Sequence, residues 1–374
     1  MKTRRAWLLI LLAVLFLVSC VGRSGSTGRT NAAPPSQPGS GPGGADAVAA
    51  EVATDHFGVG DRECWVFEPS DPAPAEAPVV VFLHGWGGMN PQGYGAWIAH
   101  LVRKGNVVIY PRYQKNLRTK PHEMTPAAIG AIREALDLLM QPGHVKPRTD
   151  CMVYVGHSLG GVIAANAAAL AGREGLPAPR AVMSVEPGDS SLARRNSGGC
   201  IKAEGILGDL RTMPADTLLM CIVGADDRVA RTDAAVRLFR AATSIPEAKK
   251  VFITVSSDDH GAPPLRADHF FPVAPDRNLQ APLNAARARG MRGRVRRFLQ
   301  RRMAERMNRG GRIGTDALDY YGTWRLLDAL AACAESGTAC DASIVDGPTL
   351  RFMGRWSDGA PVRELTVTRD PGGR

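Results

Sequence analysis

The sequence predicts an α/β protein in which a mostly parallel central sheet is covered by helices on both faces. Short apolar runs rich in β-branched residues recur along the chain, and helix-like amphipathic stretches separate them. Near-continuous apolar strands are typical of parallel sheets, because both of their faces are buried. The expected strands are residues 64–67, 78–83, 106–110, 151–155, 181–185, 217–223 and 251–255, and the expected helices are residues 93–104, 126–140, 159–171 and 232–242.

The first twenty residues have the pattern of an export signal. A basic start, Met1 to Arg5, precedes an apolar run from Ala6 to Val18 that is too short for a stable membrane span. The ending Leu-Val-Ser-Cys resembles the lipobox of bacterial lipoproteins, which implies that Cys20 is lipid-modified and becomes the mature N-terminus. The alternative is an ordinary signal peptide with an unmodified cysteine. We expect an exported protein, lipid-anchored to a bacterial membrane in the cell envelope, and to the outer membrane where the cell has one.

Three segments follow from composition. Residues 1–20 form the signal, residues 21–50 are rich in Gly, Ser and Pro and predict a flexible tether, and residues 51–374 form one domain. We expect its core at about 62–261 and a C-terminal extension at 262–374. In the extension, residues 287–312 carry eleven arginines beside one apolar stripe, which fits either a solvated helix packed on the body or a helix that binds anionic lipid. A second helix is expected at 316–334 and a hairpin at 351–366.

Charge and cysteine content limit the function classes. The formal net charge is +10, but no nucleic-acid-binding motif accompanies it, so we expect no nucleic-acid partner. Six cysteines besides Cys20 allow many pairings, and Cys333 with Cys340 is the expected disulfide. Cys151 and Cys221 lie in expected core strands, where a buried thiol is as reasonable as a bridge. No metal-binding spacing of His, Cys or Glu occurs, so we expect neither metal nor cofactor.

A sharp turn between an expected strand and an expected helix marks the candidate nucleophile. The run Gly156-His157-Ser158-Leu159-Gly160 follows strand 151–155 and opens helix 159–171. Glycines two positions before and after the serine remove side chains that would clash in such a turn, and the hydroxyl is left at the carboxyl edge of the sheet. This G-x-S-x-G pattern between a strand and a helix predicts that Ser158 is the nucleophile of a serine hydrolase.

An acid and a base follow the serine in the expected order. A serine hydroxyl needs a general base, itself oriented by a third group. Gly224-Ala225-Asp226-Asp227 comes after strand 217–223, and His260 comes after the last strand, 251–255. Over residues 62–261 the chain resembles the α/β-hydrolase superfamily, and its G-x-x-D pattern implies Asp227 as the acid, with Asp226 in reserve. His260 is the expected base, and His269 is the reserve.

The position of the acid stays open at this point. Some members of the superfamily carry it after the preceding strand, where this chain has Glu186-Pro187-Gly188-Asp189. Spacing alone does not choose among Asp227, Asp226 and these two residues.

The resemblance also implies an oxyanion hole. His84-Gly85-Trp86-Gly87-Gly88 follows strand 78–83 and is similar to the superfamily's H-G-x-G loop, in which the residue after H-G gives its N–H, here Trp86. The second donor is expected to be the N–H of Leu159, at the start of the helix after the nucleophile. Trp86, together with Met89 or Tyr94, would offer apolar surface to a substrate.

The expected activity is cleavage of carboxylic esters, small or lipid-like, through a Ser-His-Asp triad and an acyl-enzyme. The layout is similar to dienelactone-hydrolase, chlorophyllase and platelet-activating-factor acetylhydrolase branches. The first of these uses cysteine where this chain has Ser158, and chlorophyllases usually have arginine at the position of Leu159, so no branch is selected. The alternatives are an acyltransferase or amidase with the same triad, and a catalytically inactive lipoprotein that binds a partner in the envelope.

Overall fold

A nine-stranded sheet forms the centre of the molecule. The structure is a computed structural model and describes residues 30–188, 206–279, 314–336 and 342–372. In these parts of the chain the strand order is β1-β2-β4-β3-β5-β6-β7-β8-β9. The strands are β1 (Glu51–Phe57), β2 (Cys64–Ser70), β3 (Glu76–Leu83), β4 (Val107–Pro111), β5 (Lys146–His157), β6 (Ala181–Val185), β7 (Leu218–Gly224), β8 (Lys250–Val255) and β9 (Thr366–Thr368).

The sheet is parallel in its middle and antiparallel at both edges. Strands β3 to β8 pair in parallel, whereas β1 and β2 pair antiparallel at one edge and β9 pairs antiparallel with β8 at the other. Because β3 lies between β4 and β5, the chain reverses direction of travel across the sheet at this point. Leu83, near the end of β3, pairs with Gly156 of β5. The loops after these two strands therefore lie side by side, which is where ligands bind in open α/β sheets.

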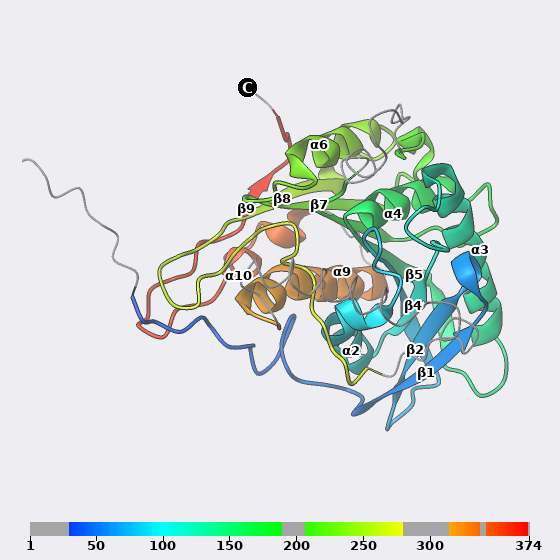
Figure 1. Cartoon of the computed structure of the whole chain (residues 1–374), viewed down its shortest axis with the longest axis horizontal. Coiled ribbons are helices and arrows are strands. Elements are labelled where there is room, and N and C mark those ends of the chain that lie inside the picture. Colours follow the sequence, from blue (N-terminus) through cyan, green and yellow to red (C-terminus); the bar gives the residue numbers. More distant parts are fainter. Residues whose placement is uncertain (1–29, 189–205, 280–313, 337–341, 373–374) are drawn as a thin grey trace, which may run out of the picture.

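Helices cover both faces of the sheet (Figure 1). On one face α2 (Gly95–Arg103) and α9 (Arg325–Ser336) contribute to one buried apolar cluster, and on the other face α3 (Pro121–Leu139), α4 (Leu159–Leu170) and α6 (Arg231–Ala241) contribute to a second. This three-layer arrangement confirms the predicted fold class. The remaining elements are α10 (Pro348–Arg351), a π-helix at Leu318–Trp324 and short 3-10 turns at Gly60–Arg62, Pro91–Tyr94, Leu210–Thr212, Glu247–Lys249 and Ala342–Val345.

The C-terminal region packs against the central sheet and adds a strand to it. Helix α9 packs on β5 and β6, and β9 adds a strand beside β8. Helix α9 covers a sheet face that would otherwise expose apolar side chains to water, so the region after the predicted core boundary near residue 261 packs against that core. The segment expected to form a hairpin at 351–366 folds back on itself around Gly359. Arg355 and Pro361 form an antiparallel bridge, and the N–H groups of Trp356 and Val362 donate to the carbonyls of Ala360 and Gly354 at 2.8 and 3.0 Å. The expected arginine-rich helix lies outside the described residues.

Residues 30–50 are ordered against the body, although the sequence predicts a flexible tether at 21–50. Thr30 donates from its N–H and its hydroxyl to the carbonyl of His260, at 2.8 and 2.9 Å. Further along, the N–H of Gly43 donates to Asp328 Oδ2 at 2.7 Å. Ala49 is buried. In Figure 1 this segment runs along the edge of the molecule toward β1. Low apolar content did not prevent order, because the segment uses backbone hydrogen bonds to groups on the finished fold.

Two further findings concern the cysteines and the helices of the described residues. Cys64, Cys151 and Cys221 are free, buried thiols, whereas Cys340 lies outside the described residues, so its pairing with Cys333 stays a prediction. None of the helices in the described ranges is long and apolar enough to cross a bilayer. Residues 1–20 are not among those ranges.

Candidate active site

Ser158 occupies the strained turn that the sequence predicts. Its φ is 55° and its ψ is −122°, in the left-handed half of backbone space that residues with a side chain seldom adopt. Gly156 and Gly160, the two glycines of the motif, lie so close to neighbouring backbone that no side chain would fit. A Cβ on Gly156 would lie 2.1 Å from the Gly160 carbonyl oxygen, and a Cβ on Gly160 would lie 2.0 Å from the carbonyl oxygen of Leu83. The turn holds the serine between β5 and α4.

His269, and not His260, contacts the serine. His269 Nε2 lies 2.9 Å from Ser158 Oγ, and His269 Nδ1 lies 2.9 Å from Asp227 Oδ2. The three side chains are nearly enclosed by protein, since Ser158 is 7% exposed and the His269 and Asp227 side chains are 3% and 2% exposed. This is the arrangement of nucleophile, base and orienting acid that activates a serine hydroxyl.

The prediction that His260 would meet Ser158 is corrected by this geometry. His260 Nε2 lies 2.7 Å from Asp358 Oδ2, and its side chain is 34% exposed. The residue follows β8 by only five positions, whereas the loop continues to His269 before it reaches the serine. Of the two histidines that the sequence suggested, His269, the second choice, is the one that lies next to Ser158.

Backbone contacts explain how the loop delivers His269. The N–H of Asp226 donates to the carbonyl of Ala267 at 3.0 Å, and the N–H of Ala267 donates to Ser257 Oγ at 2.8 Å. The loop is therefore fastened to the end of β7, two residues before His269. At Gly224 this approach is so close that a Cβ would lie 2.3 Å from the Ala267 carbonyl oxygen. Glycine at this position allows His269 to lie beside Asp227.

Asp227 is fixed as a carboxylate. Its Oδ1 accepts hydrogen bonds from the N–H groups of Val229 and Ala230 at 2.7 and 3.0 Å, while Oδ2 faces His269. Burial acts to raise the pKa of Asp227, but the hydrogen bonds from His269 and from the two amides outweigh it and leave that pKa below its ordinary value. The reserve acid, Asp226, instead accepts from Ser257 Oγ at 2.6 Å. Asp189 lies outside the described residues.

Glu186 is a second carboxylate close to the base. It is completely buried, and its Oε2 lies 3.7 Å from both His269 Nδ1 and His157 Nε2. Its Oε1 accepts from the N–H of Gly224 at 3.2 Å. His157, Glu186 and His269 offer possible ligand atoms within 4.8 Å of one another. Both ring nitrogens of His157 and both ring nitrogens of His269 already have hydrogen-bond partners, however. We therefore assign no metal to this group.

The His84 to Gly88 loop lies against the nucleophile, as the sequence predicts. A Cβ on Gly85 would lie 3.4 Å from Ser158 Cβ. Gly85 and Gly87 donate their N–H groups to Tyr94 Oη at 3.0 Å and to Gln114 Oε1 at 2.9 Å. These two hydrogen bonds hold the backbone on both sides of Trp86, whose N–H is the expected donor to an oxyanion.

His84 anchors the start of the same loop. Its ring nitrogens lie 2.7 Å from the Gly85 carbonyl oxygen and 2.6 Å from the Arg112 carbonyl oxygen, and its ring stacks on Tyr113. Burial lowers the pKa of His84 to about 4, although both carbonyl contacts act to raise it. In the neutral ring only one nitrogen carries a proton, so the ring donates to one of the two carbonyls at a time. His84 is therefore a structural support of the loop.

Apolar surface beside the site differs in part from the expectation. Tyr94, expected to offer such surface, is buried, and its hydroxyl is hydrogen-bonded to the Gly85 N–H and to His157. Phe270 is 41% exposed, and its ring meets that of His269 edge to face at 5.4 Å. No sequence pattern pointed to Phe270, because its contact with His269 depends on the path of the loop.

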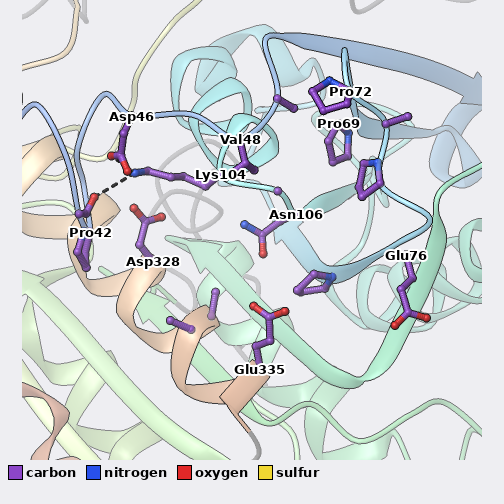
Figure 2. A pocket seen from close by; sticks show the side chains of 18 residues that line it. Pro42, Asp46, Val48, Pro69, Pro72, Glu76, Lys104, Asn106, Asp328 and Glu335 are labelled. Atoms are coloured by element: carbon purple, nitrogen blue, oxygen red, sulfur yellow. Dashed lines mark hydrogen bonds and ion pairs between the residues drawn. The ribbon is translucent and has the colours of Figure 1, made fainter.

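A separate hollow of about 670 Å³ lies near the amino-terminal ends of the strands (Figure 2). Asp328 and Glu335 of α9, Glu76 of β3 and several prolines line it, and Lys104 reaches Asp46 across one end. None of its lining residues belongs to the group around Ser158. The hollow contains neither a nucleophile nor a paired base, so we place the candidate active site at the opposite edge of the sheet.

The comparisons with known proteins agree with this architecture. Residues 80–263 match a family model described as alpha/beta hydrolase fold. A search of curated proteins found no match to the chain. The matched region includes Ser158 and Asp227 but ends before His269.

Proposed function

From the α/β-hydrolase fold of this chain, we propose that the protein is a serine hydrolase that cleaves carboxylic esters, with Ser158, His269 and Asp227 as its catalytic triad. The observation that carries the proposal is the hydrogen-bonded series from Ser158 Oγ through both ring nitrogens of His269 to Asp227. The acid is the one that the superfamily pattern implied, and the base is the reserve histidine.

In the proposed reaction, His269 Nε2 removes the proton from Ser158 Oγ as the oxygen attacks the ester carbonyl carbon. The imidazolium that forms is stabilised by Asp227, which already accepts the Nδ1–H. When the tetrahedral intermediate collapses, His269 gives the proton to the departing alkoxide, and an alcohol leaves. Water then attacks the acyl-enzyme with His269 again as base, which releases the carboxylic acid and restores the serine.

Negative charge on the carbonyl oxygen would be held by the N–H groups of Trp86 and Leu159. Removal of one such donor commonly costs 10²–10³-fold in rate, because a fixed donor needs no reorganisation as the charge develops. The Gly85 and Gly87 hydrogen bonds support this role, since they hold the loop in place before substrate binds. Trp86 and the exposed ring of Phe270 would receive the apolar part of an ester.

The nucleophile is tested by labelling with a fluorophosphonate probe. We expect wild-type protein to be labelled with loss of activity on p-nitrophenyl esters, and Ser158→Ala to be neither labelled nor active, with a melting temperature close to that of wild type. Labelling of Ser158→Ala would contradict the assignment. A series of esters from acetyl to palmitoyl measures the chain length that the site accepts.

Two related activities use the same triad. An acyltransferase would pass the acyl group to an alcohol faster than to water, and an amidase would cleave the matching amide. Product analysis with an added alcohol and with an anilide of the same acid separates these from ester hydrolysis. A protein that binds the fluorophosphonate at Ser158 cannot be the inactive envelope module that the sequence left as an alternative.

We also propose that the protein is exported and anchored by lipid on Cys20. The support is the basic, apolar and Leu-Val-Ser-Cys pattern of residues 1–20, which lie outside the described structure. Metabolic labelling with an alkyne fatty acid should mark the full-length protein and not Cys20→Ser. An unlabelled wild-type protein in the secreted fraction would contradict the anchor and leave an ordinary signal peptide.

A further inference from the structure

Tyr94 and His157 fill the space between the His84 to Gly88 loop and the backbone of His269. Tyr94 ends the short 3-10 turn before α2, and His157 ends β5 beside the nucleophile. Both side chains are buried. A Cβ on Gly85 would lie 3.2 Å from both Tyr94 Oη and His157 Nδ1. The lack of a side chain at Gly85 thus allows the two polar groups to reach the loop.

Three hydrogen bonds form a continuous series through these side chains. The N–H of Gly85 donates to Tyr94 Oη at 3.0 Å, Tyr94 Oη lies 2.8 Å from His157 Nδ1, and His157 Nε2 lies 2.8 Å from the carbonyl oxygen of His269. The series therefore starts at the oxyanion loop and ends at the residue that carries the base.

The direction of each hydrogen bond follows from the groups at the two ends. A carbonyl oxygen only accepts, so His157 Nε2 must carry a proton. Burial lowers the pKa of His157 to about 3, so the ring is neutral and its Nδ1 is an acceptor. Tyr94 must then donate its hydroxyl proton to Nδ1, which leaves an oxygen lone pair for the Gly85 N–H. All donors point the same way, from Gly85 toward His269, which strengthens each bond of the series.

We propose that Tyr94 and His157 are positioning residues that hold the oxyanion loop and the backbone of His269 in one fixed arrangement around Ser158. This inference rests on the proposed function, and it explains why a histidine stands beside the nucleophile without contacting it as a base. A donor to an oxyanion and a general base must both be placed within about 0.5 Å of their working positions. The series sets the two relative to each other across the nucleophile.

Tyr94→Phe is the first test, because it keeps the ring and removes only the hydroxyl. The matched control is Tyr154→Phe, which removes the buried Tyr154 hydroxyl of β5, a group without a hydrogen-bond partner among the described residues. We expect kcat on a p-nitrophenyl ester to fall about 10- to 100-fold in Tyr94→Phe, with KM within about threefold, since the loss lies in transition-state stabilisation. Tyr154→Phe is expected to keep the wild-type kcat.

Two substitutions of His157 separate the halves of the series. Asparagine places an acceptor where Nδ1 stands, and glutamine places a donor where Nε2 stands. His157→Asn should therefore keep the Tyr94 bond and lose the bond to the His269 carbonyl, whereas His157→Gln should do the reverse. We expect both to lower kcat. Phenylboronic acid forms a tetrahedral adduct that places an oxygen in the oxyanion site. We expect Tyr94→Phe and His157→Gln to bind it more weakly than wild type, and His157→Asn to bind it as wild type does.

Amide hydrogen exchange gives a readout that does not depend on activity. Peptides that cover residues 84–88 should exchange faster in Tyr94→Phe than in Tyr154→Phe, because the Gly85 N–H loses its acceptor. Equal exchange and equal kcat in the two variants would overturn the inference. Faster exchange with unchanged kcat and boronate affinity would also overturn it, since the bond would then have no positioning role. A wild-type protein that neither turns over esters nor reacts with the fluorophosphonate would instead refute the proposed function.

Discussion

His269 Nε2 lies 2.9 Å from Ser158 Oγ, although 111 positions separate the two residues in the sequence. The contact depends on the loop after β8, which passes His260 and is fastened to the end of β7 before it turns toward the serine. His269 is thus positioned by tertiary hydrogen bonds, and Asp227 is positioned by the local turn in which it accepts hydrogen bonds from two amides.

Substitution of the two histidines after β8 should give opposite results. His269→Ala is expected to lower kcat by about four to six orders of magnitude, because no other imidazole is in contact with Ser158 Oγ among the described residues. His260→Ala, which removes a partly exposed ring paired with Asp358, should keep kcat within about threefold. Initial rates on p-nitrophenyl acetate measure both. A large loss in His260→Ala with none in His269→Ala would restore the sequence-based assignment.

The neighbouring aspartates should differ in the same way. Asp227→Asn cannot hold the Nδ1–H tautomer of His269 as the carboxylate does, so we expect kcat to fall on the order of 10⁴-fold. Asp226→Asn alters a hydrogen bond from Ser257 Oγ and should lower kcat by less than about tenfold. Circular dichroism of both variants controls for folding. Equal, mild losses would mean that another carboxylate orients the base.

Glu186 is the carboxylate that such a result would point to. In the native arrangement we expect Glu186→Gln to lower kcat by about tenfold, because a buried negative charge 3.7 Å from His269 Nδ1 helps to stabilise the imidazolium. Glutamine keeps an oxygen that can accept from the Gly224 N–H, which limits structural damage. A loss in Glu186→Gln larger than that in Asp227→Asn would make Glu186 the triad acid.

Stability should decline in mild acid because two neutral histidines are buried. Burial lowers the pKa values of His84 and His157 to about 4 and about 3, whereas an unfolded histidine titrates near 6.5. Between these values only the unfolded state binds the proton. Stability is therefore fully present above about pH 6.5, and well below that pH each ring favours unfolding by about 1.4 kcal/mol per pH unit.

Urea unfolding at pH 7.5, 6.0 and 5.0 checks this direction. His157→Gln should be less stable than wild type at pH 7.5, but its stability should fall less steeply as the pH drops, since one of the two groups no longer titrates. Parallel pH curves for the two proteins would contradict the assignment of His157 as a ring that stays neutral in the folded state.

The sequence was sufficient for the features that depend on local pattern. Apolar runs located strands β2 to β8, and the glycines around Ser158 located the turn, because both follow from side-chain period and steric limits. The pairing of β1 with β2 and of β9 with β8 was missed. Thr366–Thr368 is only three residues long, and its strand exists because β8 offers an unpaired edge.

The choice between His260 and His269 as the partner of Ser158 could not be made from the sequence. His260 and His269 lie in one loop, and each precedes a residue that fits a turn or an apolar contact. The decision rests on the contact between Ala267 and the end of β7, which joins positions more than forty residues apart. In the sequence, this contact is reflected locally by the glycine at position 224, where the Ala267 backbone approaches closely. A glycine at that position is, however, also explained by the G-x-x-D turn.

The segment from Thr30 to Ala50 has a practical consequence for anyone who prepares a soluble form. Composition suggests a truncation at residue 50. Such a truncation would remove the buried residues Ala32 and Ala49, and also the Gly43 N–H that donates a hydrogen bond to Asp328. It would also release the backbone of His260 from Thr30, in the same loop that leads to the base. A shortened protein should therefore begin upstream of Thr30, so that it keeps the hydrogen bonds from Thr30 to the loop that carries His260 and His269.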